Sequence, residues 1–450
     1  MILIYCSKIS KRANYIFRQI FKHILGAKYE LTTSIDDFES WEGAKICYEK
    51  KPCKSGLFIQ ATDLLFETGI EGQKLHFIDY EGNVAFYQVH DRSSAFPFDP
   101  FAASFYLITR YEEYLPYIKD KFNRFEASES LAYQKGFLHK PLVNIWAEEI
   151  KKAILRKYPM EIFRNRKFQF IPTVDIDLAY SYKYKGTVRT VGALMRDLSN
   201  FNISEIFERL RVLAGLKKDP FDTYNFQLKL LKKYNLYPVY FILFADYGEF
   251  DKNIPVNNRN FQRLVKAIAD YAEVGIHPSF NSNININKLR IETERLAKVL
   301  NREITKSRQH FLRLNFPTTY RNLINIDITD DYTMGYASRP GFRASICDTY
   351  NFYDLDFETE TKLRIHPFQV MEGTLKDYMN LSVEKSLELT KEIIDQVKSV
   401  NGTFISLWHN ESLSNLGRWK GWYWIYEEMI KYALNNSGES ENPVLHSQHF

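Results

Sequence analysis

The spacing of hydrophobic residues changes along the chain near residue 168. Beyond this point, short runs of aromatic and β-branched residues alternate with segments whose apolar residues recur every three or four positions. The runs are typical of buried strands, and the segments are typical of amphipathic helices. Because strands that alternate with helices favour parallel βα units, we expect residues 168–436 to form an α/β domain of the (β/α) barrel kind.

The pattern also predicts where the individual elements lie. Strands are expected at 168–174, 237–244, 307–312 and 403–408, with an extended stretch at 361–370. Helices are expected at 261–272, after a cap at Asn260, and beyond Ser382, which is another residue type that caps helices. An aromatic helix at 419–432 is expected to close the barrel or to pack under it.

Residues 1–160 predict a separate, smaller, mixed α/β domain. Short Ile, Val and Phe runs at 1–5, 57–60, 75–80 and 84–89 are typical of strands. Asp99 followed by Pro100 predicts a helix start, because Asp can cap a helix and Pro is tolerated in the first turn. This part shows no constellation of catalytic residue types, and the charged stretch 156–167 is the expected linker.

Composition and charge narrow the class of protein. Of the 450 residues 45% are hydrophobic, which excludes a disordered chain, and the length allows two or three domains. The net charge of +5, from 60 basic and 55 acidic residues, is too small to indicate a nucleic-acid partner. The aromatic content of 16% suits a large core, and it also suits stacking on sugars.

Targeting signals and cysteine spacing predict a cytoplasmic protein. No stretch is long and apolar enough for a transmembrane segment. The first twelve residues place a short apolar run before their charges, which is the reverse of a secretory signal. The four cysteines show no C-x-x-C spacing and indicate neither a zinc knuckle nor a redox pair, so a reducing compartment is expected: Cys6, Cys47, Cys53 and Cys347.

Two carboxylates stand at the end of the strand predicted at 168–174. Side chains two apart on a strand point to the same face, so Asp175 and Asp177 can converge on one proton or one cation. Acidic residues at a strand end can also simply form a turn that caps the next segment.

Further polar residues follow the ends of later predicted strands. Together with the two carboxylates they form a set of six: Asp175, Asp177, His277, His310, Arg343 and His409. The carboxyl ends of parallel barrel strands form the catalytic face. Two Asp and two His suit a Zn-like divalent metal, with His409 left as a proton carrier and Arg343 as an orienting cation. Either histidine alone could instead be a hydrogen-bonded, partly buried imidazole.

Four stretches carry a resemblance to a known family: Thr173-Val174-Asp175-Ile176-Asp177, His277 with Ser279, Arg339-Pro340-Gly341-Phe342-Arg343, and Leu407-Trp408-His409-Asn410. In this order, over residues 168–436, they resemble the polysaccharide deacetylase superfamily, the NodB-like carbohydrate esterases. The chain is similar in particular to a bacterial subgroup with an N-terminal domain of unknown function. This implies a distorted (β/α) barrel of the polysaccharide deacetylase type.

The resemblance also implies a reaction. It makes Asp175 the general base, Asp177 and His277 metal ligands, and His409 the catalytic acid. Arg343 would orient the base. The implied activity is the removal of N-acetyl groups from an amino-sugar glycan or its precursor, with one divalent, Zn-like ion as cofactor.

This sequence departs from the family pattern at the metal site. The family motif is His-Ser/Thr-x-x-His, and its second His is replaced here by Asn281. Water, Asn281 or a remote imidazole must then fill one coordination position. We expect His310 to do so, because its strand should follow that of His277. Two alternatives are a metal-free, non-catalytic barrel that binds a glycan or a partner, and a hydrolase of small amides.

Overall fold

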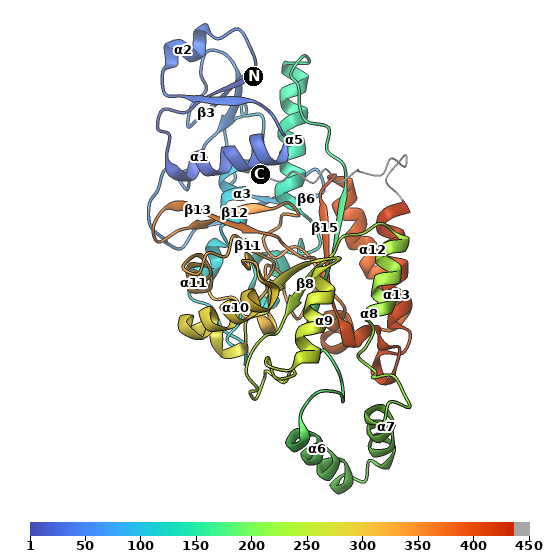
Figure 1. Ribbon diagram of the computed structural model, residues 1–450. Helices are drawn as coiled ribbons and strands as arrows, with labels where there is room; N and C mark the ends of the chain where they lie inside the picture. The colour runs from blue at the N-terminus through green and yellow to red at the C-terminus, as the bar shows by residue number, and fades with distance from the viewer. Residues whose placement is uncertain (436–450) are drawn as a thin grey trace.

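The computed structural model describes residues 1–435 and shows two units stacked on one another (Figure 1). The N-terminal unit begins with a parallel sheet in the order β2-β1-β3-β4. Its elements are β1 (Ile2–Tyr5), α1 (Lys11–Phe17), η1 (Arg18–Ile24), β2 (Tyr29–Thr32), α2 (Ile35–Ser40), β3 (Lys45–Glu49) and β4 (Leu57–Gln60). They are followed by β5 (Phe77–Tyr80), β6 (Asn83–Phe86), α3 (Pro100–Ile108), η2 (Tyr111–Tyr114), η3 (Ala127–Glu129), α4 (Leu131–Gln134) and α5 (Leu142–Lys157).

The C-terminal unit is built on a nine-stranded sheet in the order β12-β13-β11-β10-β9-β8-β7-β15-β14. Its first half holds β7 (Gln169–Ile176), α6 (Thr187–Ser199), α7 (Ile203–Leu213), α8 (Tyr224–Lys233), β8 (Val239–Ile242), α9 (Arg259–Ala269), β9 (Glu273–Ile276), η4 (Phe280–Ile284), α10 (Ile286–Leu300), β10 (Lys306–Ser307) and η5 (His310–Leu312). Its second half holds α11 (Thr318–Ile324), β11 (Asp330–Asp331), β12 (Tyr350–Asp354), β13 (Thr359–Ile365), β14 (Val370–Met371), η6 (Thr374–Tyr378), α12 (Val383–Ser399), β15 (Thr403–His409), η7 (Asn410–Ser414), η8 (Gly417–Trp419) and α13 (Trp422–Asn435).

The strand pairing confirms the predicted α/β class. Every pair in the large sheet is parallel except β12 with β13. The parallel strands expected of a distorted barrel are therefore present, although within residues 1–435 no ladder joins β14 to β12 to close a ring. The carboxyl ends of the parallel strands consequently meet along one edge, where the functional side chains lie.

Several local predictions match the structure and others do not. Asp99 caps α3 by accepting from two backbone N–H groups, and Ser382 caps α12, as predicted. The cap of α9 is Asn258 and not Asn260. The strand expected at 307–312 is limited to β10, because Phe311 and Leu312 adopt positive φ values of 59° and 54° and turn the chain away.

The boundary between the units is occupied by a continuous core. Helix α5 ends at Lys157 and β7 begins at Gln169, while residue 436, the expected end of the second domain, lies outside the described residues. One hydrophobic cluster contains buried side chains of both units, among them Phe105 and Tyr353, whose rings lie 5.3 Å apart. The two units therefore share a core in addition to a surface contact.

Two of the four cysteines are paired in the structure. Cys47 lies in β3 and Cys53 in the turn that follows, and the two form a disulfide. Cys6 and Cys347 are free and buried. A C-x-x-C search misses this pair, because the bond closes a longer turn between two strands. Disulfides are typical of oxidising compartments, so the cytoplasmic location stays a prediction.

Candidate functional site

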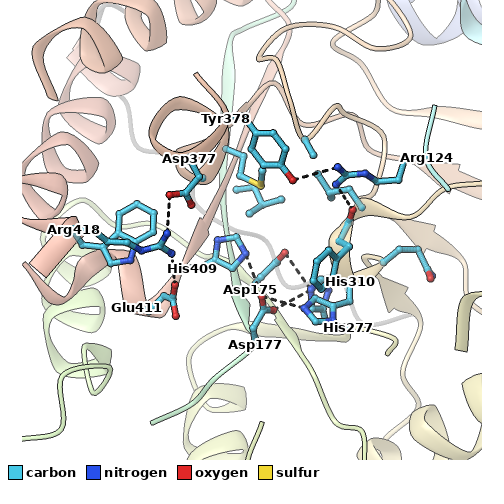
Figure 2. Close-up of a pocket in the computed structure, with 18 residues that line it drawn as sticks. Arg124, Asp175, Asp177, His277, His310, Asp377, Tyr378, His409, Glu411 and Arg418 are labelled. Carbon is cyan, nitrogen blue, oxygen red and sulfur yellow. Dashed lines mark hydrogen bonds and ion pairs between the residues drawn. The ribbon is translucent and has the colours of Figure 1, made fainter. Parts of the chain in front are cut away.

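Strand β7 carries the two carboxylates to the edge of the sheet. It lies between β15 and β8, and Asp175 is in register with His409 of β15. Asp175 is buried, whereas Asp177 lies just past the strand end and has a side chain that is 30% exposed. Both point into the same cavity, as the two-residue spacing predicts (Figure 2).

Asp177, His277 and His310 form a candidate metal centre. One ligand atom from each lies within 4.8 Å of the others. His277 Nε2 lies 3.2 Å from Asp177 Oδ1, and His310 Nε2 lies 3.4 Å from Asp177 Oδ2. His310 thus completes a set of three candidate ligands, whereas Asn281 is exposed to solvent.

Hydrogen bonds on the far side of each ring fix the orientation of the two imidazoles. His277 Nδ1 lies 2.5 Å from the carbonyl oxygen of Arg308, which can only accept, so Nδ1 carries the hydrogen. His310 Nδ1 lies 2.9 Å from Asp251 Oδ1, which also accepts from the Phe280 backbone N–H. Both rings therefore direct Nε2 at Asp177, which is the arrangement that metal-binding histidines adopt.

The charges of this cluster shift the pKa values of its own members. Burial alone would raise the pKa of Asp177, but the positive charges of the nearby His310 and His409 hold that pKa well below its usual range. Burial would lower the pKa of His310, but the carboxylates of Asp177 and Asp251 outweigh it and raise the pKa to about 9. Asp177 is thus an ionised carboxylate whose negative charge balances the positive charge of the imidazoles beside it.

His409 approaches the same carboxylate from β15. Its Nε2 lies 3.6 Å from Asp177 Oδ2, and its Nδ1 lies 2.8 Å from Oε1 of the fully buried Glu372. Burial would lower the pKa of His409, but Glu372 and Asp177 raise it well above its usual value. His409 therefore lies at the edge of the cavity with a carboxylate near each of its ring nitrogens.

Arg308, and not Arg343, orients Asp175. The Arg308 guanidinium donates from Nη1 to Asp175 Oδ1 at 2.8 Å and from Nε to the Tyr332 carbonyl oxygen at 3.0 Å. The expected contact between Arg343 and Asp175 is absent, so that prediction is wrong. Arg343 instead forms a two-bond ion pair with Glu113 of the N-terminal unit, at 2.9 and 2.6 Å. A buried guanidinium group needs a carboxylate in the same buried region, and the carboxylate buried beside Arg343 is that of Glu113.

Sequence reasoning missed three supporting side chains of the site. Arg308 lies two residues before His310, so the spacing that linked Asp175 with Asp177 could have identified it. Glu372 follows β14 directly and could have been noticed as another polar residue after a strand. Asp251 lies in the loop between β8 and α9, and no local sequence pattern distinguishes it from acidic residues that are exposed.

The site lines a cavity of about 340 Å³ to which both units contribute. Figure 2 shows Arg124 of the N-terminal unit on one side and Arg418 with Glu411 on another. Arg124 donates to the Phe311 carbonyl oxygen at 2.9 Å and to the Tyr378 hydroxyl at 3.3 Å. The N-terminal unit thus supplies part of the wall, although its sequence shows no catalytic constellation.

Comparison with solved structures finds similar chains that are named as polysaccharide deacetylases. One from Mycobacterium smegmatis is 14% identical, with a TM-score of 0.40, over 60% of this chain and 86% of that chain. One from Bacillus cereus is 11% identical, with a TM-score of 0.29, over 63% and 95%. A CE4 family pseudoenzyme from Bacillus anthracis is 11% identical, with a TM-score of 0.28, over 59% and 61%. Likeness at this level carries no conclusion about activity.

The N-terminal unit has a match of a different kind. No curated protein matches the chain. Residues 2–159 match the model of DUF7033, a family of unknown function. The N-terminal unit is therefore similar to that family, while the C-terminal part of the chain is similar in structure to polysaccharide deacetylases.

Proposed function

We propose that the protein is a metal-dependent hydrolase that removes N-acetyl groups from an amino-sugar glycan or its precursor. The observation that carries this proposal is the convergence of His277 and His310 Nε2 on Asp177, with Asp175 and His409 on either side. Three ligands with a base and an acid beside them are what metal-assisted hydrolysis of an amide requires.

Asp177, His277 and His310 fit a borderline divalent cation such as zinc. Two imidazoles and one carboxylate are ligand types that such ions prefer, and three protein ligands leave a position for substrate. Asp177 Oδ1 is buried and receives no well-aligned hydrogen bond, which a cation would compensate. A divalent ion held there would polarise the amide carbonyl and make a water molecule more acidic.

The remaining steps belong to the side chains of this protein. Asp175 Oδ2 lies 3.8 Å from His277 Nε2 and faces the cavity, where it can accept the proton of the attacking water. Arg308 occupies Asp175 Oδ1 and so leaves Oδ2 as the basic atom. His409 would donate its Nε2 proton to the departing amine, while Glu372 keeps the imidazolium in place.

The side chains that line the cavity support a sugar substrate. The aromatic side chains of Tyr378 and Trp419 form part of its wall, and such rings offer an apolar face and a polar tip to a pyranose. The charged groups Arg418, Glu411 and Asp377 stand close together at the same wall and can accept or donate hydrogen bonds to hydroxyl groups.

A second function is favoured by one feature of the same cluster. Protonated His310 and His409 can neutralise Asp177 without a metal, because both have a raised pKa. The C-terminal unit could then be a non-catalytic barrel that binds a glycan or a partner.

One experiment separates these functions. The full chain is purified, its bound metal is measured by mass spectrometry, and acetate release from N-acetylglucosamine oligomers is compared with release from simple amides. We expect about one divalent ion per chain and turnover of the oligomers that Asp175→Asn abolishes without removing the metal. Protein with no metal and no turnover would support the binding barrel, and turnover of simple amides alone would indicate a small-molecule amidase.

A further inference from the structure

Helices α6 and α7 form an arm that projects from the body of the molecule (Figure 1). We define the arm as residues 183–218, inserted between β7 and α8. Its root is fixed, because Asp219 accepts hydrogen bonds from the backbone N–H groups of residues 181–183. The arm leaves the body a few residues after Asp177, at the sheet edge that carries the site.

The outer surface of the arm is unusually apolar. Ten of the 26 exposed large hydrophobic side chains within residues 1–435 fall in this one segment: Val188, Val191, Met195, Leu198, Phe201, Ile203, Phe207, Leu210, Leu213 and Leu216. Phe201 is 87% exposed and Phe207 is 63% exposed. Such a concentration on one element indicates a surface that contacts something else.

The periodicity of the arm shows that this exposure is organised. In α6 the exposed apolar residues are separated by three, four and three positions, which aligns them on one side of the helix. On the other side Asp197 and Arg209 are buried and pair at 2.6 Å, and Arg209 stacks over Tyr182. The arm therefore buries an ion pair and exposes most of its large apolar side chains, the reverse of a helix that packs on a core.

The arm also carries the charge excess of the whole chain. It contains eight basic and three acidic residues, and the resulting excess of five equals the net charge of +5 of all 450 residues. Three basic side chains are well exposed: Arg196 at 69%, Lys218 at 55% and Lys217 at 39%. Burial and the neighbouring Arg189 lower the pKa of Lys185 to about 8, which reflects the crowding of positive charge.

We propose that this arm is a docking surface for an anionic lipid bilayer. An amphipathic pair of helices with Phe, Leu and Met on one side and Lys and Arg beside them has the features of an interfacial membrane element. A second copy of the chain is a poorer occupant, because two arms with the same charge excess would repel one another. Within residues 1–435 no helix is long and apolar enough to cross a bilayer, so the arm lies on the surface.

Vesicle flotation tests this proposal with the full chain. Vesicles of phosphatidylcholine alone are compared with vesicles that contain about 30% phosphatidylglycerol, at about 0.1 and 0.5 M NaCl. We expect the protein to float with the anionic vesicles, and to float less at the higher salt. Phe201→Ser with Phe207→Ser should lower the vesicle partition constant about tenfold or more. Lys217→Glu with Lys218→Glu should weaken binding to the anionic vesicles selectively.

Matched variants elsewhere control for general loss of apolar surface or charge. Met160→Ser with Ile162→Ser removes residues that are 91% and 80% exposed in the linker, and Lys50→Glu with Lys51→Glu reverses an exposed basic pair. Both controls should float like the unaltered protein. A protein that does not float, or arm variants that float unchanged, would overturn the proposal. A dimer that Phe201→Ser with Phe207→Ser converts to a monomer, without vesicle binding, would assign the arm to self-association.

Discussion

At the scale of single residues, three imidazole Nε2 atoms lie between 3.2 and 3.6 Å from the carboxylate oxygens of Asp177. Each of these rings is held from behind by an acceptor: the Arg308 carbonyl oxygen, Asp251 or Glu372. The orientation of these rings therefore depends on groups outside the candidate ligand set. Such residues influence metal affinity strongly, because they fix the tautomer and the orientation of the ring.

Asp251 provides a direct test of this dependence. Asp251→Asn keeps an acceptor for His310 Nδ1 but removes the negative charge, so we expect the affinity for a divalent ion to fall about 10–100-fold. His310→Ala should abolish stoichiometric binding. Competition with a chelator measures both effects. The exposed His76, changed to Ala, serves as the control and should leave affinity unchanged.

Arg308 provides a test of the base. Arg308→Lys should lower kcat about 100-fold or more, because an ammonium group cannot bond both Asp175 and the Tyr332 carbonyl oxygen in the observed geometry. Its metal content should stay near that of the unaltered protein. Arg343→Lys should instead lower Tm and leave kcat nearly unchanged. A large loss of kcat in Arg343→Lys, with kcat nearly unchanged in Arg308→Lys, would restore Arg343 as the orienting residue.

At the scale of elements, β9 and β10 carry His277 and Arg308 to the site, and their spacing depends on Gly275. A Cβ atom at this glycine would lie 2.7 Å from the backbone oxygen of Lys306 and 2.8 Å from the Phe241 ring. Neither neighbour can move freely, because both belong to strands of the same sheet. Gly275 thus allows the two strands to approach closely enough for their side chains to meet.

Gly275→Ala should therefore destabilise the fold by about 1–3 kcal/mol through overpacking. It should also weaken metal binding, since β10 would be displaced together with His310. Urea unfolding and chelator competition measure the two effects. Gly192→Ala in α6 is the matched control: a Cβ atom there meets nothing within 4 Å, and Ala favours a helix, so stability should be unchanged or slightly higher.

At the scale of the whole molecule, a buried ionic network joins the two units. Glu113 of the N-terminal unit bonds Arg343 of the C-terminal unit, and it also accepts from Arg110 Nε at 2.7 Å. Burial would raise the pKa of Glu113, but the two guanidinium groups outweigh it and lower that pKa below its usual value. The network, together with the shared core, makes the two units mutually dependent.

The lowered pKa of Glu113 predicts a pH dependence. A carboxylate whose pKa is lower in the folded than in the unfolded state stabilises the fold at pH values above its unfolded pKa of about 4.3. This stabilisation is lost as the pH falls through the folded-state pKa. Glu113→Gln should therefore cost about 3–5 kcal/mol at pH 7, and less as the pH drops below about 4. Denaturant unfolding across pH measures the difference. The exposed Glu388→Gln is the control, and an equal cost for Glu113→Gln at all pH values would contradict the argument.

The sequence by itself determined the features that depend on local periodicity. Strand and helix alternation and the placement of carboxylates and imidazoles at strand ends follow from repeats of two and 3.6 residues. The caps at Asp99 and Ser382 follow from side chains that accept from the first backbone N–H groups of a helix. These local features bring Asp175, Asp177, His277 and His409 to one edge. The catalytic roles and domain limits assigned from the sequence remain predictions.

Only the tertiary structure decided which distant groups pair. Positive φ values at Phe311 and Leu312 turn the chain so that His310 reaches Asp177, and no repeat in the sequence encodes that turn. Arg343 is drawn to Glu113 because a buried guanidinium needs a carboxylate within its own interior, and the core between the units supplies it. Only the structure shows that the arm leaves its apolar side uncovered, since periodicity shows that a helix has an apolar side but not whether the fold covers it.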